Sequence, residues 1–251
     1  RRDMTEAEHS LVVADISGYT RFVVENRQHW RHAQVLISEL LQEVVSRAEP
    51  SLRLEKLEGD AAFFVERDPQ QNAEAIQGPI ASMFEGFGEI LRRAVDQNPC
   101  KCEACTGMDR LRLKVVAHRG AIAHQAIAGR DEVSGLAVIV THRLLKNNVR
   151  RSHYILLTEE ALQGWTGPEA ALERGKLADK DLGSIPYWVH FPPDPLGLAP
   201  ASRAPWARRF LRGLWLLTGD ILFALGLRKS GPFRNIADEA IAEPAGAGAP
   251  S

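Results

Sequence analysis

Two aspartates, Asp15 and Asp60, stand where a pair of carboxylates can bind metal. Each follows a short strand-like segment and adjoins a turn with glycine, so each carboxylate is presented at a strand end. Mg²⁺ prefers oxygen ligands and completes its shell with water and substrate phosphates. Two such ions would activate an attacking oxygen and neutralise phosphate charge. A helix cap for Asp15 and a hairpin turn for Asp60 are the structural alternative.

A second candidate site is a compact cysteine cluster, Cys100, Cys102 and Cys105. Soft thiolates at this spacing suit Zn²⁺ or an iron–sulfur cluster, although no fourth ligand is obvious from the sequence. Redox-active thiols and inert loop cysteines remain alternatives. The odd, clustered count argues against a secreted disulfide scaffold.

The elements that would position the aspartates can be read from the hydrophobic pattern. Residues 11–14 are a continuous apolar run, which predicts a buried strand, and residues 34–47 carry apolar residues at helical spacing. Residues 52–57 and 61–65 predict a hairpin whose turn lies at Gly59-Asp60.

The remaining pattern mixes helices and strands. It predicts a helix over 72–95, paired strands over 111–118 and 120–128, a polar loop over 130–135, a strand end leading into a helix over 138–149, and short strands over 154–158 and 187–191. Such mixing indicates an α+β fold in which helices pack on a sheet.

Composition divides the chain of 251 residues. We expect a polar leader over 1–10, one globular domain over 11–191, a proline-rich linker over 192–207, an apolar helix over 208–229 and a disordered tail over 230–251. Hydrophobic residues make up 45% of the chain, which is enough to form a hydrophobic core. The formal net charge is -1, so the overall charge does not indicate binding to nucleic acid.

The apolar segment 208–229 predicts an amphipathic C-terminal helix. Arg212 and Asp220 lie inside it, which argues against a bilayer span and favours a helix on a membrane surface or against a partner. Packing onto the same domain is the alternative. With no signal-peptide pattern, we expect a cytoplasmic protein, with the inner face of the membrane as a candidate peripheral location.

Several motifs resemble those of class III adenylyl and guanylyl cyclases. Residues 13–20, Val-Ala-Asp-Ile-Ser-Gly-Tyr-Thr, look like the first metal-binding motif, and residues 56–61, Lys-Leu-Glu-Gly-Asp-Ala, like the second. His118-Arg119-Gly120 resembles the strand motif that follows, and Gly135, Val138 and Arg143 fit the later one. The hairpin, the cysteines and residues 142–147 look closest to an uncharacterised bacterial branch of this superfamily.

The resemblance implies a ferredoxin-like domain with a mostly antiparallel sheet. It also implies site roles: Asp15 and Asp60 hold two Mg²⁺ or Mn²⁺ ions, and Arg143 stabilises the transition state. Lys56 and Glu132 fall at base-reading positions, and Lys180 is a candidate for the triphosphate lysine. The implied reaction is attack of the ribose 3′-hydroxyl of ATP on its α-phosphate, in an active site formed by a homodimer.

One departure separates the chain from the family pattern. Ile139 stands four residues before Arg143, where the family has a transition-state asparagine. An isoleucine cannot orient a ribose or phosphate by hydrogen bonding, and losing one such contact costs about 10²–10³ in rate. Three functions therefore compete: a weakened cyclase, an inactive cyclase-type dimer for nucleotide or protein recognition, and a metal or redox sensor built on the cysteines.

Overall fold

The computed structural model describes residues 6–25, 30–49, 51–68, 74–97, 107–163, 165 and 171–197. The cysteine cluster, the segments 208–229 and 230–251, for which a helix and a tail were predicted, and most of the proline-rich segment lie outside these residues. Within them, no helix has both the length and the apolar character needed to cross a membrane.

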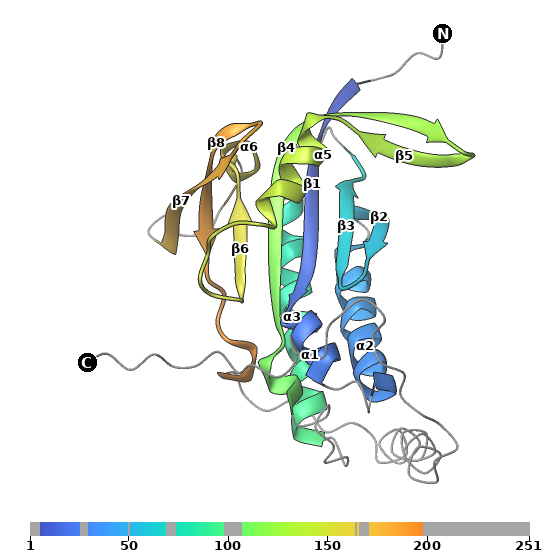
Figure 1. Cartoon of the computed structure of the whole chain (residues 1–251), viewed down its shortest axis with the longest axis vertical. Helices are drawn as coiled ribbons and strands as arrows, with labels where there is room; N and C mark the ends of the chain where they lie inside the picture. The colour runs from blue at the N-terminus through green and yellow to red at the C-terminus, as the bar shows by residue number, and fades with distance from the viewer. Residues whose placement is uncertain are drawn as a thin grey trace.

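The described residues alternate strands and helices along the chain (Figure 1). The elements are β1 (Glu6–Ser17), α1 (Tyr19–Glu25), α2 (Trp30–Ala48), β2 (Leu52–Glu58), β3 (Ala61–Glu66), α3 (Glu74–Gln97), η2 (Gly107–Arg110), β4 (Arg112–Ile127), β5 (Arg130–Ser134), α5 (Leu136–Leu144), β6 (Tyr154–Leu157), α6 (Glu159–Leu162), β7 (Leu172–Asp179), β8 (Gly183–His190) and η4 (Pro195–Gly197).

The strands form one sheet in the order β2-β3-β1-β4-β6-β8-β7, and β5 pairs with the far end of β4. Every pairing is antiparallel except that between β4 and β6. The expected α+β fold with a mostly antiparallel sheet is therefore confirmed.

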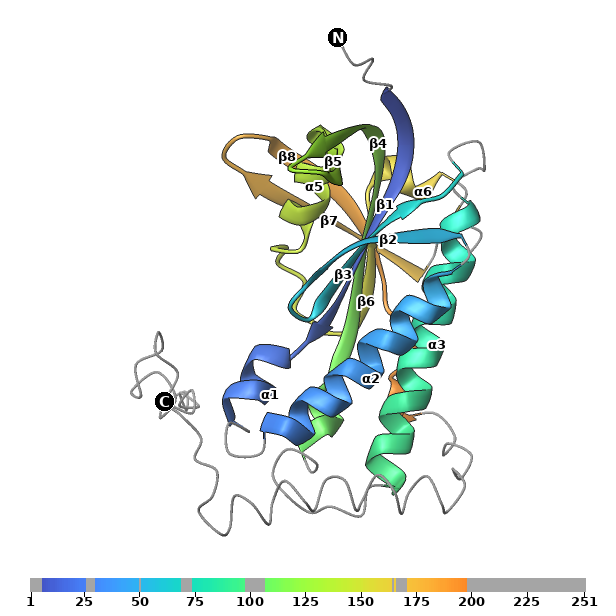
Figure 2. The ribbon, with the colours of Figure 1, turned by 90° about the vertical axis from the view of Figure 1, so that its right-hand side faces the viewer.

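Helices cover both faces of the sheet (Figure 2). On one face α2 and α3 lie side by side, and Val12, Ala14 and Ile16 of β1 pack under them. On the other face α5 lies over β1 and β4, where Leu11 and Val13 join its packing. Strand β1 is thus buried on both sides, as its continuous apolar run predicted.

The hairpin of β2 and β3, the helix over 72–95 and the strand at 154–158 are confirmed, with boundaries that shift by a few residues. Strand β1 begins at Glu6, earlier than expected, because its first residues pair with β4 as far as Ala123. Helix α1 and strand β7 were not predicted.

The prediction of two paired strands over 111–118 and 120–128 is wrong. Both segments belong to one continuous strand, β4, whose partner on that side is β5, in the segment predicted as a polar loop. Residues 136–144 are helical throughout, without the expected strand end. Gly120 does not break β4; a Cβ there would lie 3.0 Å from the Cβ of Ala137 on α5.

We expect Gly120→Ala to destabilise the protein by about 1–3 kcal/mol, because the added methyl group forces α5 away from β4. Gly107→Ala is the matched control, since a Cβ there meets none of the described atoms within 4 Å. Urea denaturation midpoints measure both. Equal midpoints for Gly120→Ala and wild type would show that the close approach of α5 is unimportant.

Candidate functional site

Asp15 and Asp60 lie beside each other at one end of the sheet. Antiparallel pairing of β1 and β3 places Asp15 opposite Ala61, the residue after Asp60. The N–H of Ile16 donates to the carbonyl oxygen of Asp60 at 3.2 Å, which holds the β2–β3 turn against the end of β1. The two aspartates of the separate motifs are therefore brought together.

A lysine completes this group. Lys114 on β4 pairs in register with Asp15, and its Nζ lies 3.2 Å from Asp15 Oδ1. The sequence interpretation missed Lys114, because strand alternation predicts which face it occupies but not which residue stands across from it. That information comes only with the pairing of β1 and β4.

The electrostatics of the group favour a further cation. Burial, followed by the neighbouring Asp15 carboxylate, raises the pKa of Asp60 to about 6, against the opposing effects of its own backbone N–H and Lys114. Two carboxylates thus share a partly buried place, and the ammonium of Lys114 contacts one of them, Asp15. This set of oxygen donors fits Mg²⁺ or Mn²⁺. The described residues contain no group of three or more His, Cys, Asp or Glu side chains suited to a metal.

A second group joins α5 to the β7–β8 turn. Arg143 Nε lies 3.6 Å from Asp179 Oδ2, and its NH2 lies 3.7 Å from Asp181 Oδ2. Lys180 Nζ lies 3.9 Å from the same Asp181 oxygen. The two predicted phosphate-binding cations, Arg143 and Lys180, therefore gather around one acidic turn.

Asp179 organises that turn. Its Oδ1 accepts the N–H groups of Asp181 at 2.9 Å and Leu182 at 3.1 Å, and these bonds hold the pKa of the Asp179 carboxyl below its usual range. One carboxylate thus shapes the turn with one oxygen and faces Arg143 with the other. No sequence pattern singles out Asp179, since Asp-Lys-Asp also suits an ordinary turn.

The other predicted residues lie apart from these two groups. Lys56 on β2 stands cross-strand from Phe63, on the α5 face of the sheet, and Glu132 on β5 pairs with Gln125. Figure 1 shows β5 and the end of β4 projecting beyond the sheet. In the described part of the chain, no hydrogen bond or ion pair joins Lys56 or Glu132 to Asp15, Asp60 or Arg143.

Ile139 lies on α5, one turn before Arg143, and is 50% exposed. Its exposure means that the core does not require an apolar side chain there. The His118 motif has contacts of its own: His118 Nδ1 lies 2.8 Å from Thr158 Oγ1, and Arg119 NH1 donates to Glu66 Oε2 at 2.8 Å. His118 thus ties β4 to the residue after β6, and Arg119 reaches across β1 to β3.

Solved structures of cyclase catalytic domains share the fold of this chain. The adenylyl cyclase CyaB from P. aeruginosa superposes with a TM-score of 0.59 at 16% identity, over 76% of this chain and 98% of that one. The guanylyl cyclase Cya2 superposes with a TM-score of 0.55 at 12% sequence identity, and the match covers 76% of this chain and 95% of that one. The guanylate cyclase domain of RhGC from Catenaria anguillulae, in complex with GTP, has a TM-score of 0.54 at 15% sequence identity. This match covers 74% of this chain and 98% of that one.

The chain has the class III nucleotidyl cyclase fold. At these identities the similarity establishes the fold, and the activity is a separate question. The order of strands in this fold explains why Asp15 and Asp60 meet, since β1, which carries Asp15, is paired with β3, which follows Asp60 directly.

Sequence comparisons place this cyclase-type domain near proteins without an assigned activity. Residues 37–154 match a family described as "Protein of unknown function (DUF2652)". "Uncharacterized protein Rv2561/Rv2562" of Mycobacterium tuberculosis is 35% identical over 127 residues, which are 51% of this chain and 59% of that protein. The match thus spans less than two thirds of the relative. Both findings agree with the predicted resemblance to an uncharacterised bacterial branch.

The pKa of Asp60 predicts a pH-dependent stability. The folded protein keeps this proton between the ordinary value of 3.8 and about 6, where the unfolded chain has lost it. The contribution of Asp60 to the free energy of unfolding is therefore fully present below pH 3.8 and is lost as the pH rises through about 6. Asn cannot ionise, so we expect the urea midpoint of Asp60→Asn to lack this decline with rising pH. A chelator is present in the measurement to keep metal ions off the carboxylates.

Asp96→Asn, at an exposed position in α3, is the matched control and should keep the wild-type pH profile. Parallel profiles for wild type and Asp60→Asn would contradict the raised pKa of Asp60.

Proposed function

We propose that the chain is a nucleotidyl-cyclase-like domain that binds ATP with Mg²⁺ or Mn²⁺ and converts it to cyclic AMP and pyrophosphate with weakened activity. The observation that carries this proposal is the carboxylate pair, Asp15 and Asp60, in which burial, followed by the neighbouring Asp15 charge, raises the pKa of Asp60 to about 6. Solved cyclase domains of the same fold include one with bound GTP and one with ATPαS, which supports a nucleotide as the ligand class.

The carboxylates would hold the ions, with water and the nucleotide phosphates as the remaining ligands. When bound, these ions would neutralise phosphate charge and lower the pKa of the attacking 3′-hydroxyl. Lys114 keeps part of the negative charge balanced without the ions, because its ammonium already contacts Asp15.

Arg143 and Lys180 would bind the triphosphate. Arg143 is 41% exposed, and its ion pairs with Asp179 and Asp181 exceed 3.5 Å, which is typical of weak surface pairs. A polyphosphate carries more charge than the two carboxylates, so it can compete for both cations. Lys56 and Glu132 would contact the base.

A homodimer follows from this division of roles. The carboxylate pair and the Arg143–Lys180 group lie on different elements, and no ion pair links them in the described residues. We propose that the carboxylates of one copy meet Arg143 and Lys180 of the other, as the cyclase resemblance implies. Each copy would then contribute to both sites of the dimer.

The alternative function is an inactive cyclase-type dimer that recognises nucleotide or another protein. Ile139 favours it, because this exposed apolar residue stands one turn from Arg143, where an amide would orient the substrate. Binding and turnover must therefore be measured separately.

We expect a non-hydrolysable ATP analogue to bind saturably in isothermal titration only when Mg²⁺ or Mn²⁺ is present. Asp15→Asn should weaken this binding by roughly 10- to 100-fold, since it removes one of two carboxylate ligands. Asp96→Asn serves again as the exposed control. Lack of binding by the wild type at millimolar nucleotide would refute the proposal.

We also expect Ile139→Asn to raise cyclic AMP production by roughly 10- to 100-fold, because it supplies an amide near the reacting phosphate. Leu136→Asn is the matched control, since it lies on the same helix, is 62% exposed and precedes Ile139 by one turn. An assay of both variants with Mn²⁺ measures the effect. If neither produces cyclic nucleotide while the analogue still binds, the inactive alternative holds.

A further inference from the structure

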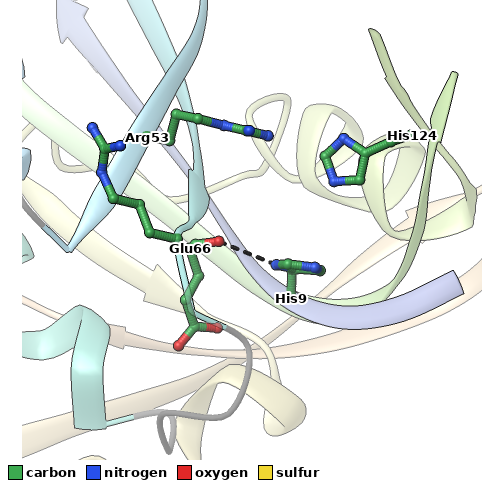
Figure 3. Close-up of a pocket in the computed structure, with 5 residues that line it drawn as sticks. His9, Arg53, Glu66 and His124 are labelled. Carbon is green, nitrogen blue, oxygen red and sulfur yellow. Dashed lines mark hydrogen bonds between the residues drawn. The ribbon is translucent and has the colours of Figure 1, made fainter. Parts of the chain in front are cut away.

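A pocket of about 210 Å³ opens at the other end of β1, lined by His9, Arg53, Glu66, Arg67 and His124 (Figure 3). None of these residues belongs to the carboxylate pair or to the Arg143–Lys180 group. The pocket lies on the same face of the sheet as α5.

Strand alternation explains why basic side chains converge there. His9 shares the face of Leu11 on β1, Arg53 stands cross-strand from Val65, and His124 shares the face of Ile122 on β4. Leu11, Val65 and Ile122 all pack on the α5 side. Arg67 adds a further cation just after β3, so the basic residues come from separate strands.

Glu66 does not oppose these charges with its carboxylate. Its Oε2 accepts the Ser10 N–H at 3.0 Å and Arg119 NH1 at 2.8 Å, while its carbonyl oxygen lies 3.1 Å from His9 Nδ1. Figure 3 shows the Glu66 carboxylate turned away from His9, with the dashed bond on the carbonyl oxygen. Glu66 therefore contributes its neutral carbonyl oxygen to the pocket, and not its charged carboxylate.

The arginines are balanced by carboxylates of their own. Arg53 Nε donates to Glu55, and Arg67 NH2 lies 3.4 Å from Glu49. Among the described residues Arg53 uses only Nε in this bond, which leaves its terminal amino groups as donors. With the two ion pairs cancelling, the histidines determine the net charge of the pocket.

His9 and His124 are placed to act together. Their ring centroids lie 6.1 Å apart in an edge-to-face arrangement, and His9 is only 9% exposed. Because His9 Nδ1 is paired with the Glu66 carbonyl oxygen, its Nε2 remains for another partner. Protonation of both rings adds two positive charges and two N–H donors to the pocket.

We propose that this pocket binds a small oxyanion, such as a sulfate or phosphoryl group, together with the uptake of protons by His9 and His124. Arg53 and Arg67 would contact the anion through their terminal amino groups, which present fork-shaped donors to tetrahedral oxyanions. The volume suffices, since a cavity of about 150 Å³ already holds a benzene molecule. This site is independent of the proposed cyclase function.

Sulfate is the probe, because its charge stays constant where histidine titrates, whereas the charge of phosphate changes. Isothermal titration of the full chain should show saturable binding that is roughly tenfold tighter near pH 6 than near pH 8. By linkage, sulfate binding should be accompanied by proton uptake, measured from the dependence of the binding enthalpy on the ionisation enthalpy of the buffer, and His9→Gln and His124→Gln should each reduce that uptake.

Arg53→Gln and His124→Gln should each weaken sulfate binding near pH 6 by roughly tenfold, while circular dichroism confirms that they fold. Arg21→Gln is the matched control: Arg21 makes the same Nε bond to a nearby glutamate, Glu25, on α1.

Absence of saturable sulfate binding near pH 6 would overturn the proposal. So would binding that survives in both pocket variants but is lost in Lys180→Gln, because the anion would then occupy the Arg143–Lys180 group. A result of either kind leaves the nucleotide titration unaffected, so the two proposals fail separately.

Discussion

Strand β1 is hydrogen-bonded along both edges, to β3 and to β4, and packed on both faces. The register of these two ladders places Asp15 beside the β2–β3 turn on one side and beside Lys114 on the other. A shift by one residue would turn Asp15 towards the face covered by α2 and α3 and Ile16 away from it, which the core opposes. The carboxylate pair therefore depends on apolar packing away from the site.

Much of this arrangement could be predicted from the sequence, because it rests on local patterns. The apolar run of β1, the alternation of β2 and the glycine of its turn each have one dominant interpretation. The long strand β4 was missed because Arg119-Gly120 looks like a break. The structure gives Gly120 another role, since it allows α5 to approach the sheet. Strand β7 was missed because its Leu-Glu-Arg-Gly-Lys-Leu-Ala-Asp sequence lies at the sheet edge and is largely exposed.

The candidate site was only partly predictable. Asp15, Asp60 and Arg143 stand in recognisable motifs, whereas Lys114 and Asp179 acquire meaning only through partners distant in sequence. The basic pocket is a stronger case, since His9, Arg53 and His124 come from three strands and share no motif. No local pattern relates them; the order of the strands in the sheet does.

The length of β1 has a consequence for how the two ends of the domain can influence each other. His9 and Asp15 lie on the same strand face, six residues or about 20 Å apart at the usual rise per residue. A single small ligand cannot touch both. A small shift of β1 along its axis cannot couple the two ends either, because a change of register by one residue would exchange its buried faces. Substitutions at the two ends should therefore change the free energy of unfolding additively.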